Sequence, residues 1–191
     1  MGYQKLPKRL QFLLVHLVVV AVNDMHMEST IRTMRATDWE YVAKIYEEGV
    51  ATGVATFETK VPSFEAWDKA HLNICRFVAE NKDVILGWVA LSPVSSRCVY
   101  GGVAEVSVYV SKDARGKGIG KQLLEHLISE SEKEGLWTLQ SGVFPTNLSS
   151  IKVHEAVGFR CIGKRERVGK LNGQWVDNVL FERRSTIVGI D

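Results

Sequence analysis

The chain has 191 residues and a formal net charge of +2, with 46% hydrophobic and 24% charged residues. These values are typical of one globular domain with a substantial core, and they argue against a nucleic-acid partner, because no run of basic residues with interleaved aromatics occurs. The cysteines Cys75, Cys98 and Cys161 lie too far apart for a zinc site or a disulfide framework. We therefore expect buried thiols, no bound metal and a cytoplasmic protein.

Residues 1–29 differ from the rest of the chain. A basic start is followed by an apolar run from Phe12 to Val22. This run is shorter than the about 20 residues that span a bilayer, and the small-residue cleavage site of a signal peptide does not follow it. We therefore expect an N-terminal extension over residues 1–29 that is no membrane anchor, a folded domain over 30–185 and a tail over 186–191.

The first half of the domain predicts a strand, two helices and a hairpin. A capping box at Thr37, with Glu40 three residues on, indicates the start of the first helix, and Ser63 caps the second. Thr56 and Phe57 lie in the loop between these helices. The expected elements are a strand over Thr30–Arg35, helices from Thr37 and from Ser63 to about Leu72, and a hairpin of Arg76–Glu80 with Val84–Leu91.

The stretch Ala104–Gly120 predicts a strand, a glycine-rich turn and the start of a helix that ends near Gly135. Alternation along the strand puts Glu105, Ser107 and Tyr109 on one face and the intervening valines on the other. Glycines at the start of a helix favour an anion site, because free N–H groups point outward and a phosphate can approach the backbone. The turn matches neither the Gly-Lys-Ser/Thr nucleotide loop nor Gly-x-Gly-x-x-Gly.

The remaining chain predicts a strand, a short helix and two final strands. These are Leu136–Val143, Asn147–Val157, Arg160–Gly169 and Gln174–Arg184. On the short helix, Asn147, Ser150 and His154 share one face because of their spacing. Two interpretations remain open here: a polar stripe that contacts a ligand, or an N-cap followed by a core histidine. The order of strands and helices indicates a mixed α/β domain.

Two motifs carry a resemblance to a known family. Arg115 to Gly120 has the pattern Arg-x-x-Gly-x-Gly after a strand, and Asn147–Phe159 follows at the matching separation. Both resemble the coenzyme A segments of the GCN5-related N-acetyltransferases (GNAT), and the resemblance covers roughly residues 31–184. Ala55–Thr59 and Ser107–Val110 are further similar to the phosphinothricin acetyltransferase branch.

The resemblance implies an α/β fold with a mixed, mostly antiparallel sheet and helices on both faces. It also implies acetyl-coenzyme A as co-substrate and direct transfer of its acetyl group to the amine of a small amino-acid-like acceptor, such as phosphinothricin or methionine sulfoximine. The residues expected to bind coenzyme A are Val108, Tyr109, Val110, Arg115, Gly116, Lys117, Gly118, Ile119, Gly120, Lys121, Asn147 and Ser150.

The expected catalytic groups are Glu105 and His154. Glu105 would act as the base for the acceptor amine, and a backbone N–H at or near Val108 would polarise the acetyl carbonyl. His154 would protonate the leaving thiolate, unless it is a core histidine. Thr56 and Phe57 are expected in the substrate pocket.

One departure from the branch concerns the substrate. The branch carries Tyr-Arg-x-Thr before the strand glutamate, whereas Tyr100 is followed here by Gly101 and Gly102. Tyr100 stays a substrate candidate, and Arg97 is a candidate for the missing positive charge.

Other functions and assemblies remain open. A non-catalytic acyl-coenzyme A sensor and an acetyltransferase for a protein amine are the alternative functions. Residues 175–181 form either a homodimer strand or a solvated edge strand.

Overall fold

The computed structural model describes residues 29–190, so the expected N-terminal extension, apart from Ser29, lies outside the described residues. In the part of the chain that is described, no helix has the length and apolarity needed to cross a membrane.

A single sheet of seven strands organises the domain, in the order β1-β2-β3-β4-β5-β7-β6. Neighbouring strands are antiparallel except β4 and β5, which are parallel. The strands are β1 (Thr30–Thr33), β2 (Phe77–Asn81), β3 (Val84–Pro93), β4 (Val103–Val110), β5 (Thr138–Val143), β6 (Arg160–Leu171) and β7 (Gln174–Arg184). The mixed, mostly antiparallel sheet is confirmed.

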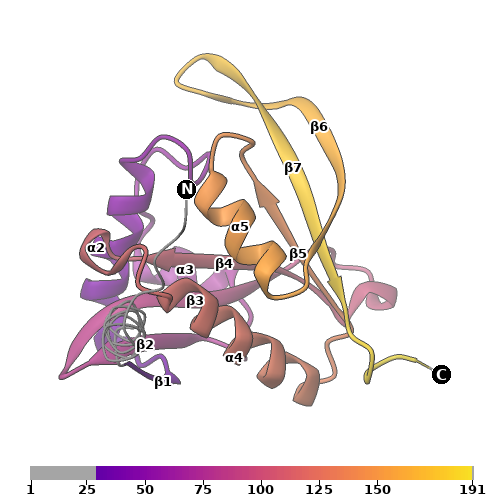
Figure 1. Ribbon diagram of the computed structural model, residues 1–191, viewed down its shortest axis with the longest axis horizontal. Helices are drawn as coiled ribbons and strands as arrows, with labels where there is room; N and C mark the ends of the chain where they lie inside the picture. Colours follow the sequence, from indigo (N-terminus) through magenta and orange to yellow (C-terminus); the bar gives the residue numbers. More distant parts are fainter. Residues whose placement is uncertain (1–28, 191) are drawn as a thin grey trace, which may run out of the picture.

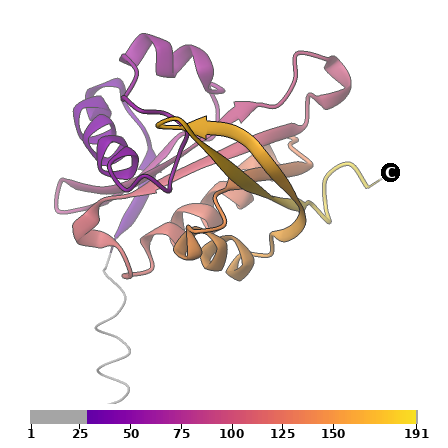
Figure 2. The same cartoon turned by 90° about the horizontal axis from the view of Figure 1, so that it is seen from above.

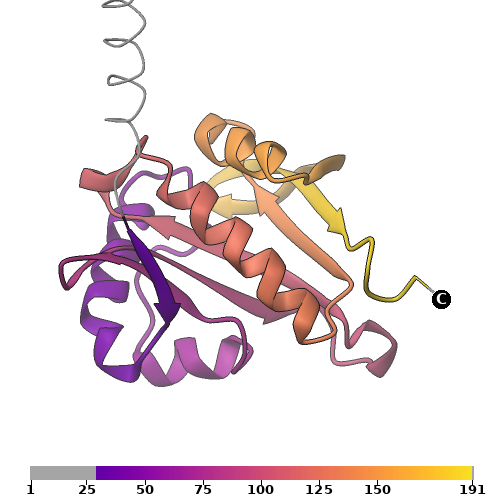
Figure 3. The same ribbon diagram turned by 60° about the horizontal axis from the view of Figure 1, so that its bottom comes forward.

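Helices cover both faces of the sheet, as expected (Figure 2). They are α2 (Trp39–Val50), α3 (Phe64–Ala70), α4 (Ile119–Lys133) and α5 (Leu148–Ala156). One buried cluster joins α2 and α3 to Val78 and Trp88, and the other joins α4 to β4 and β5 through Leu123, Leu127 and Val106. Figure 3 shows α4 crossing the face of the sheet opposite α2 and α3.

The local capping signals were predicted with mixed success. Ser63 caps α3 by accepting a hydrogen bond from the Ala66 N–H, and Asn147 caps α5 by accepting one from the Ser150 N–H. The capping box at Thr37 is wrong, because a 3-10 turn over Ala36–Asp38 precedes α2. The N-cap of this turn is Arg35, two residues before the predicted cap, and the Asp38 carboxylate accepts hydrogen bonds from both the Arg35 N–H and the Arg32 guanidinium.

The expectation of three buried thiols holds for one of them. Cys75 is buried, whereas Cys98 and Cys161 are exposed. Cys161 lies on β6, whose first nine residues are all exposed because this strand forms the sheet edge. Cys98 begins a 3-10 turn, Cys98–Tyr100, on the connection between β3 and β4.

The parallel strands β4 and β5 begin side by side and then diverge (Figure 1). Their paired residues run from Val103 and Thr138 to Glu105 and Gln140. Beyond Glu105 the two strands separate, so the backbone of the second half of β4 faces a gap in the sheet.

Candidate active site

The backbone of β4 directs an N–H group into the gap between β4 and β5. The Ser111 N–H donates to the Leu86 carbonyl at 2.8 Å, so Ser111 and every second residue before it face β3. Val108 lies in the alternate phase, and its N–H therefore faces β5. Since the described pairing of β4 with β5 ends at Glu105, this N–H is free to bind a ligand. It matches the carbonyl-polarising donor expected at or near Val108.

A cavity of about 200 Å³ opens at this gap. Residues on both faces of the sheet line it, because the separated strands leave a passage from one face to the other. The lining residues are Ala55, Thr56, Phe57, Glu105, Val106, Ser107, Val108, Tyr109, Ser141, Gly142, Val143, Phe144, Asn147, Ser150, His154 and Asn178. The expected residues Glu105, Thr56, Phe57, Asn147, Ser150 and His154 are thus brought together with Val108 and Tyr109.

The face of the sheet under α2, here called the Glu105 side, holds an exposed carboxylate above buried hydroxyls. Glu105 accepts a hydrogen bond from Gln140 Nε2 at 3.5 Å. Deeper in, the Tyr109 ring stacks on Trp88 at 4.7 Å and contacts Tyr46 at 4.7 Å. Burial raises the pKa of Tyr109 far above its usual range, and the neighbouring Tyr46 adds to this shift. Tyr109 therefore stays protonated and lines the site without acting as a base.

The loop between α2 and α3 closes the same side. The Phe57 ring contacts Phe144 edge-on at 4.6 Å, and a methyl group at Gly169 of β6 would come within 2.8 Å of the Phe57 ring. The amide of Asn147 holds this loop to α5 by donating to the Val54 carbonyl at 3.3 Å. Phe57 is therefore fixed between β5 and the hairpin of β6 and β7.

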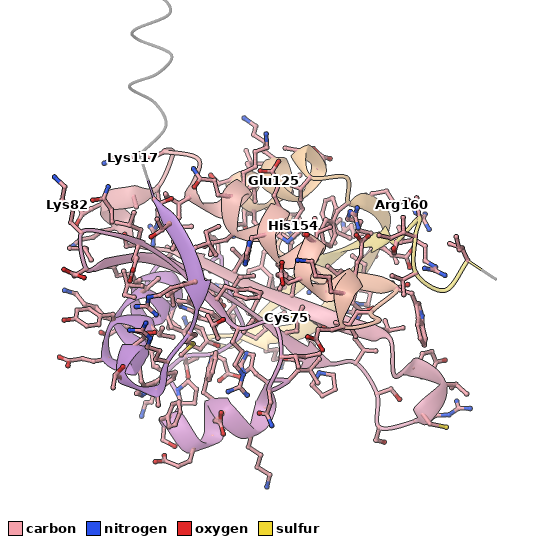
Figure 4. All side chains as sticks on the ribbon, turned by 90° about the horizontal axis from the view of Figure 1, so that it is seen from below. Cys75, Lys82, Lys117, Glu125, His154 and Arg160 are labelled. Atoms are coloured by element: carbon pink, nitrogen blue, oxygen red, sulfur yellow. The ribbon has the colours of Figure 1, made fainter. Side chains whose placement is uncertain are left out.

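His154 lies on the opposite side of the gap and is 1% exposed (Figure 4). Its ring contacts Phe159 edge-on at 5.1 Å, and its Nδ1 lies 2.8 Å from the Ser150 carbonyl oxygen. Because a carbonyl only accepts, Nδ1 carries the proton and Nε2 carries a lone pair. Burial lowers the pKa of His154 below its ordinary value. This geometry supports the core-histidine alternative over the proton donor.

The glycine turn before α4 has the conformation that the anion site requires. Gly116 and Gly118 have φ values of +76° and +84°, and Gly118 is the N-cap of α4. Nothing lies within 4 Å of a methyl group placed at Gly116, so a ligand can reach the backbone there. Arg115 Nε donates to the Val110 carbonyl at 3.3 Å. Its guanidinium braces β4 against the turn.

The other residues expected at this turn contribute backbone or surface charge. Ile119 is 1% exposed and packs in the core, so only its backbone can contact a ligand. Gly120 lies between β4 and α5, since a methyl group there would be 3.5 Å from Val110 Cγ2 and 3.7 Å from Val153 Cγ2. Lys117 lies at the periphery by the turn (Figure 4). Lys121 Nζ lies 3.6 Å from Glu125 Oε1 on the surface of α4.

Two expected substrate residues do not line the cavity. Arg97 and Tyr100 lie on the connection between β3 and β4, where the Arg97 guanidinium lies 5.8 Å from the centre of the Tyr100 ring. Conversely, the sequence prediction missed Ser141, Gly142, Phe144 and Asn178. The available signal was the polar residue Asn178 within a run otherwise typical of a buried strand. This signal places Asn178 at the cavity only when it is known that β7 pairs with β5.

Comparison with known proteins agrees with this geometry. The model of the acetyltransferase (GNAT) family matches residues 33–159. A phosphinothricin N-acetyltransferase of Alcaligenes faecalis is 33% identical over 161 residues, which cover 81% of each chain. An L-methionine sulfoximine/L-methionine sulfone acetyltransferase of Pseudomonas paraeruginosa is 31% identical over 157 residues, 79% of this chain and 91% of that protein.

Among solved structures, a GNAT superfamily phosphinothricin acetyltransferase from Sinorhizobium meliloti in complex with acetyl-coenzyme A has a TM-score of 0.78 and 30% identity. The match covers 86% of this chain and 92% of that one. The family match spans more than half of the chain, and the fold and the glycine turn agree with it. The chain therefore belongs to the acetyltransferase (GNAT) family.

Proposed function

We propose that this enzyme transfers an acetyl group from acetyl-coenzyme A to the amine of a small amino-acid-like acceptor by direct attack. The observation that carries the proposal is the gap between β4 and β5, where the Val108 N–H and the Glu105 carboxylate meet in one cavity. The relatives named for phosphinothricin and methionine sulfoximine support this class of acceptor.

The residues present fit acetyl-coenzyme A. The open backbone at Gly116 and the N-cap Gly118 suit the pyrophosphate, because the first N–H groups of α4 and the helix dipole favour an anion. The pantetheine arm would lie along the gap beside Val108 and Ser150. When bound, acetyl-coenzyme A supplies an acetyl group activated as a thioester.

The residues on the Glu105 side prepare the acceptor. Glu105 takes a proton from the acceptor ammonium, directly or through water, since its carboxylate is exposed at the cavity. An amine with a pKa of about 8 to 10 is already partly neutral near pH 7, so a modest base suffices. The amine nitrogen then forms a bond to the acetyl carbon, and the Val108 N–H stabilises the carbonyl oxygen. As the carbon–sulfur bond breaks, the nitrogen releases its second proton to solvent and the amide is formed.

The departing thiolate needs little help. A thiol pKa of about 8.5 makes the thiolate a good leaving group, and solvent supplies the proton that the thiolate takes up. His154 does not need to act as an acid, and its Nδ1 proton is held by the Ser150 carbonyl. We propose that His154 fixes the position of α5 beside the gap.

A thiol-release assay with acetyl-coenzyme A and a panel of small amines tests the proposal. We expect turnover by the wild type and a loss of about 10²- to 10⁴-fold in kcat for Glu105→Gln. Glu40→Gln, an exposed glutamate on α2, is the matched control and should retain full activity. Acetyl-coenzyme A binding without turnover of any amine would favour the sensor alternative. Turnover of peptide amines alone would favour a protein acceptor.

A cytoplasmic location and a homodimer through residues 175–181 remain part of the proposal. Trp175 is 58% exposed on β7, next to the sheet edge formed by β6, which supports an association surface there. Sedimentation of the wild type against Trp175→Ser decides between a dimer and a solvated edge.

A further inference from the structure

The carboxamide of Asn178 is a buried polar group that the protein leaves unsatisfied. Asn178 is 7% exposed, and among the described residues its Oδ1 has no hydrogen-bond partner. A buried acceptor without a partner destabilises a folded protein, so such groups are rare outside functional sites. Asn178 also lines the cavity at the gap between β4 and β5. A ligand in this cavity is therefore the natural partner for Oδ1.

Strand geometry places Asn178 on the Glu105 side of the sheet. Phe181 and Val179 pack in the core cluster with α4, so the alternate residue Asn178 faces the other side. On β5, a methyl group at Gly142 would come within 2.6 Å of Asn178 Nδ2. Gln140 shares this face with Gly142 and donates to Glu105. Asn178 and Glu105 thus bound the same half of the cavity, and glycine at position 142 leaves room for the carboxamide.

The charges that line the cavity limit which acceptor substituents can bind there. Among the described residues that line it, Glu105 is the ionised side chain, and neither lysine nor arginine is present. Arg97 lies over the Tyr100 ring and lines no part of the cavity. An anionic substituent on the acceptor would lie near the Glu105 carboxylate without a cation to pair with it. A substituent that donates a hydrogen bond would meet Asn178 Oδ1.

We propose that Asn178 determines acceptor specificity by accepting a hydrogen bond from an N–H donor in the acceptor's side chain. The favoured acceptors are amino-acid-like amines with an uncharged, N–H-bearing side chain, and those with an anionic side chain are disfavoured. This inference rests on the proposed acetyl transfer and assigns Asn178 no part in the chemical step.

Methionine sulfoximine and methionine sulfone provide the test, because they differ only in an N–H that replaces an oxygen on sulfur. For the wild type we expect kcat/KM to be about 10-fold higher with the sulfoximine. Its N–H donates a hydrogen bond to Asn178 Oδ1, whereas the sulfone places an oxygen against that same oxygen. For Asn178→Leu the ratio should fall to near one, mainly through a higher KM for the sulfoximine. Asn178→Val serves the same purpose if the leucine variant does not fold.

Gln174→Leu is the matched control, since it replaces a carboxamide on the same strand at an exposed position. It should keep the wild-type ratio. Equal kcat/KM for both acceptors in the wild type, or an unchanged ratio in a folded Asn178→Leu variant, would overturn the role of Asn178. Failure to acetylate any amine while acetyl-coenzyme A still binds would instead overturn the proposed acetyl transfer itself.

Discussion

Gly49 of α2 lies against the ring of Tyr109: a methyl group at position 49 would come within 2.6 Å of the Tyr109 Cδ1 atom. The missing side chain lets the helix approach β4 closely. The Tyr109 ring is thereby held against Tyr46 and Trp88, at the base of the cavity. A glycine inside a helix costs about 0.5–1 kcal/mol relative to alanine, so this close approach outweighs a propensity loss.

Gly49→Ala should therefore destabilise the domain and disturb the acceptor site. Overpacking costs about 1–3 kcal/mol, and the gain in helix propensity offsets part of it. We expect a lower Tm and a higher KM for the acceptor, because Tyr109 must move into the cavity. Glu47→Ala, on the exposed face of the same helix, is the control and should change neither quantity. A Gly49→Ala variant that melts above the wild type would contradict this account.

The glycine turn should respond to substitution in a way that separates ligand binding from backbone strain. Gly118 and Gly135 both have positive φ, at opposite ends of α4. Valine at either position strains the backbone by a similar amount, but only Gly118→Val obstructs the anion site. Calorimetry should find acetyl-coenzyme A affinity lost in Gly118→Val and retained in Gly135→Val. Equal affinities in two folded variants would remove the turn from the binding site.

The buried imidazole of His154 makes a prediction about pH. Its pKa is lowered in the folded state, so the unfolded chain binds a proton first as the pH falls. The stability from neutral His154 is full above about pH 6.5 and is lost as the pH falls below that value. His71 has a lowered pKa for the same reason, so the contribution of His154 is isolated by comparing the wild type with His154→Ala.

The His154→Ala variant should have a lower Tm, a weaker pH dependence of stability and a kcat within a few-fold of the wild type. Loss of a packed core side chain costs about 2–4 kcal/mol. A kcat reduced by about 10²-fold with an unchanged Tm would instead restore the role of proton donor.

A second pH dependence of stability should come from Asp38, which is 6% exposed and whose Oδ2 lies 2.7 Å from Arg32 Nη1. Arg32 lowers the pKa of Asp38, so this stabilisation is present above the ordinary aspartate pKa of about 3.9 and is lost as the pH falls below it. Asp38→Ala should lower stability by about 1–3 kcal/mol, because the Arg35 N–H loses its acceptor and Arg32 keeps only Glu80 as a carboxylate partner. Asp113→Ala, at an exposed site, is the control for denaturant melts at neutral pH. Equal losses in both variants would show that burial of the pair is irrelevant.

The elements that the sequence predicted well are those whose signals are local. The glycines before α4, the alternation along β4 and the capping of α3 by Ser63 all lie within a few residues of the structure that they specify. Thr37 was the local signal that failed, since it lies inside a 3-10 turn whose N-cap is Arg35 and whose Asp38 carboxylate accepts from the Arg35 N–H.

Part of the candidate site depends on pairings that no local pattern reveals. Asn178 reaches the cavity because β7 lies beside β5, with Val143 opposite Val179. Tyr109 is held at the cavity against Tyr46 because Gly49 lets α2 approach its ring. Arg97 was assigned to the substrate from its closeness in sequence to Tyr100, and it contacts that ring outside the cavity.

The last prediction concerns the charge of the acceptor. Gly101 stands where the resembling branch has an arginine, and a charge-assisted pair with an anion contributes roughly 1.5–3 kcal/mol. At about 1.4 kcal/mol for each tenfold, phosphinothricin should be turned over with a kcat/KM about 10- to 100-fold below that of an arginine-bearing relative.

Arg97 separates the two explanations of such a result. Because its guanidinium lies over the Tyr100 ring, Arg97→Ala should leave turnover of phosphinothricin and of neutral acceptors within about twofold. Gly101→Arg should raise phosphinothricin turnover if the missing charge is the sole defect. A methyl group at Gly101 would be 3.2 Å from the Cys98 carbonyl, so a small shift of the turn accompanies the change, and Gly101→Gln controls for it. Robust wild-type turnover of phosphinothricin that disappears in Arg97→Ala would mean that Arg97 swings into the cavity when an anionic acceptor binds.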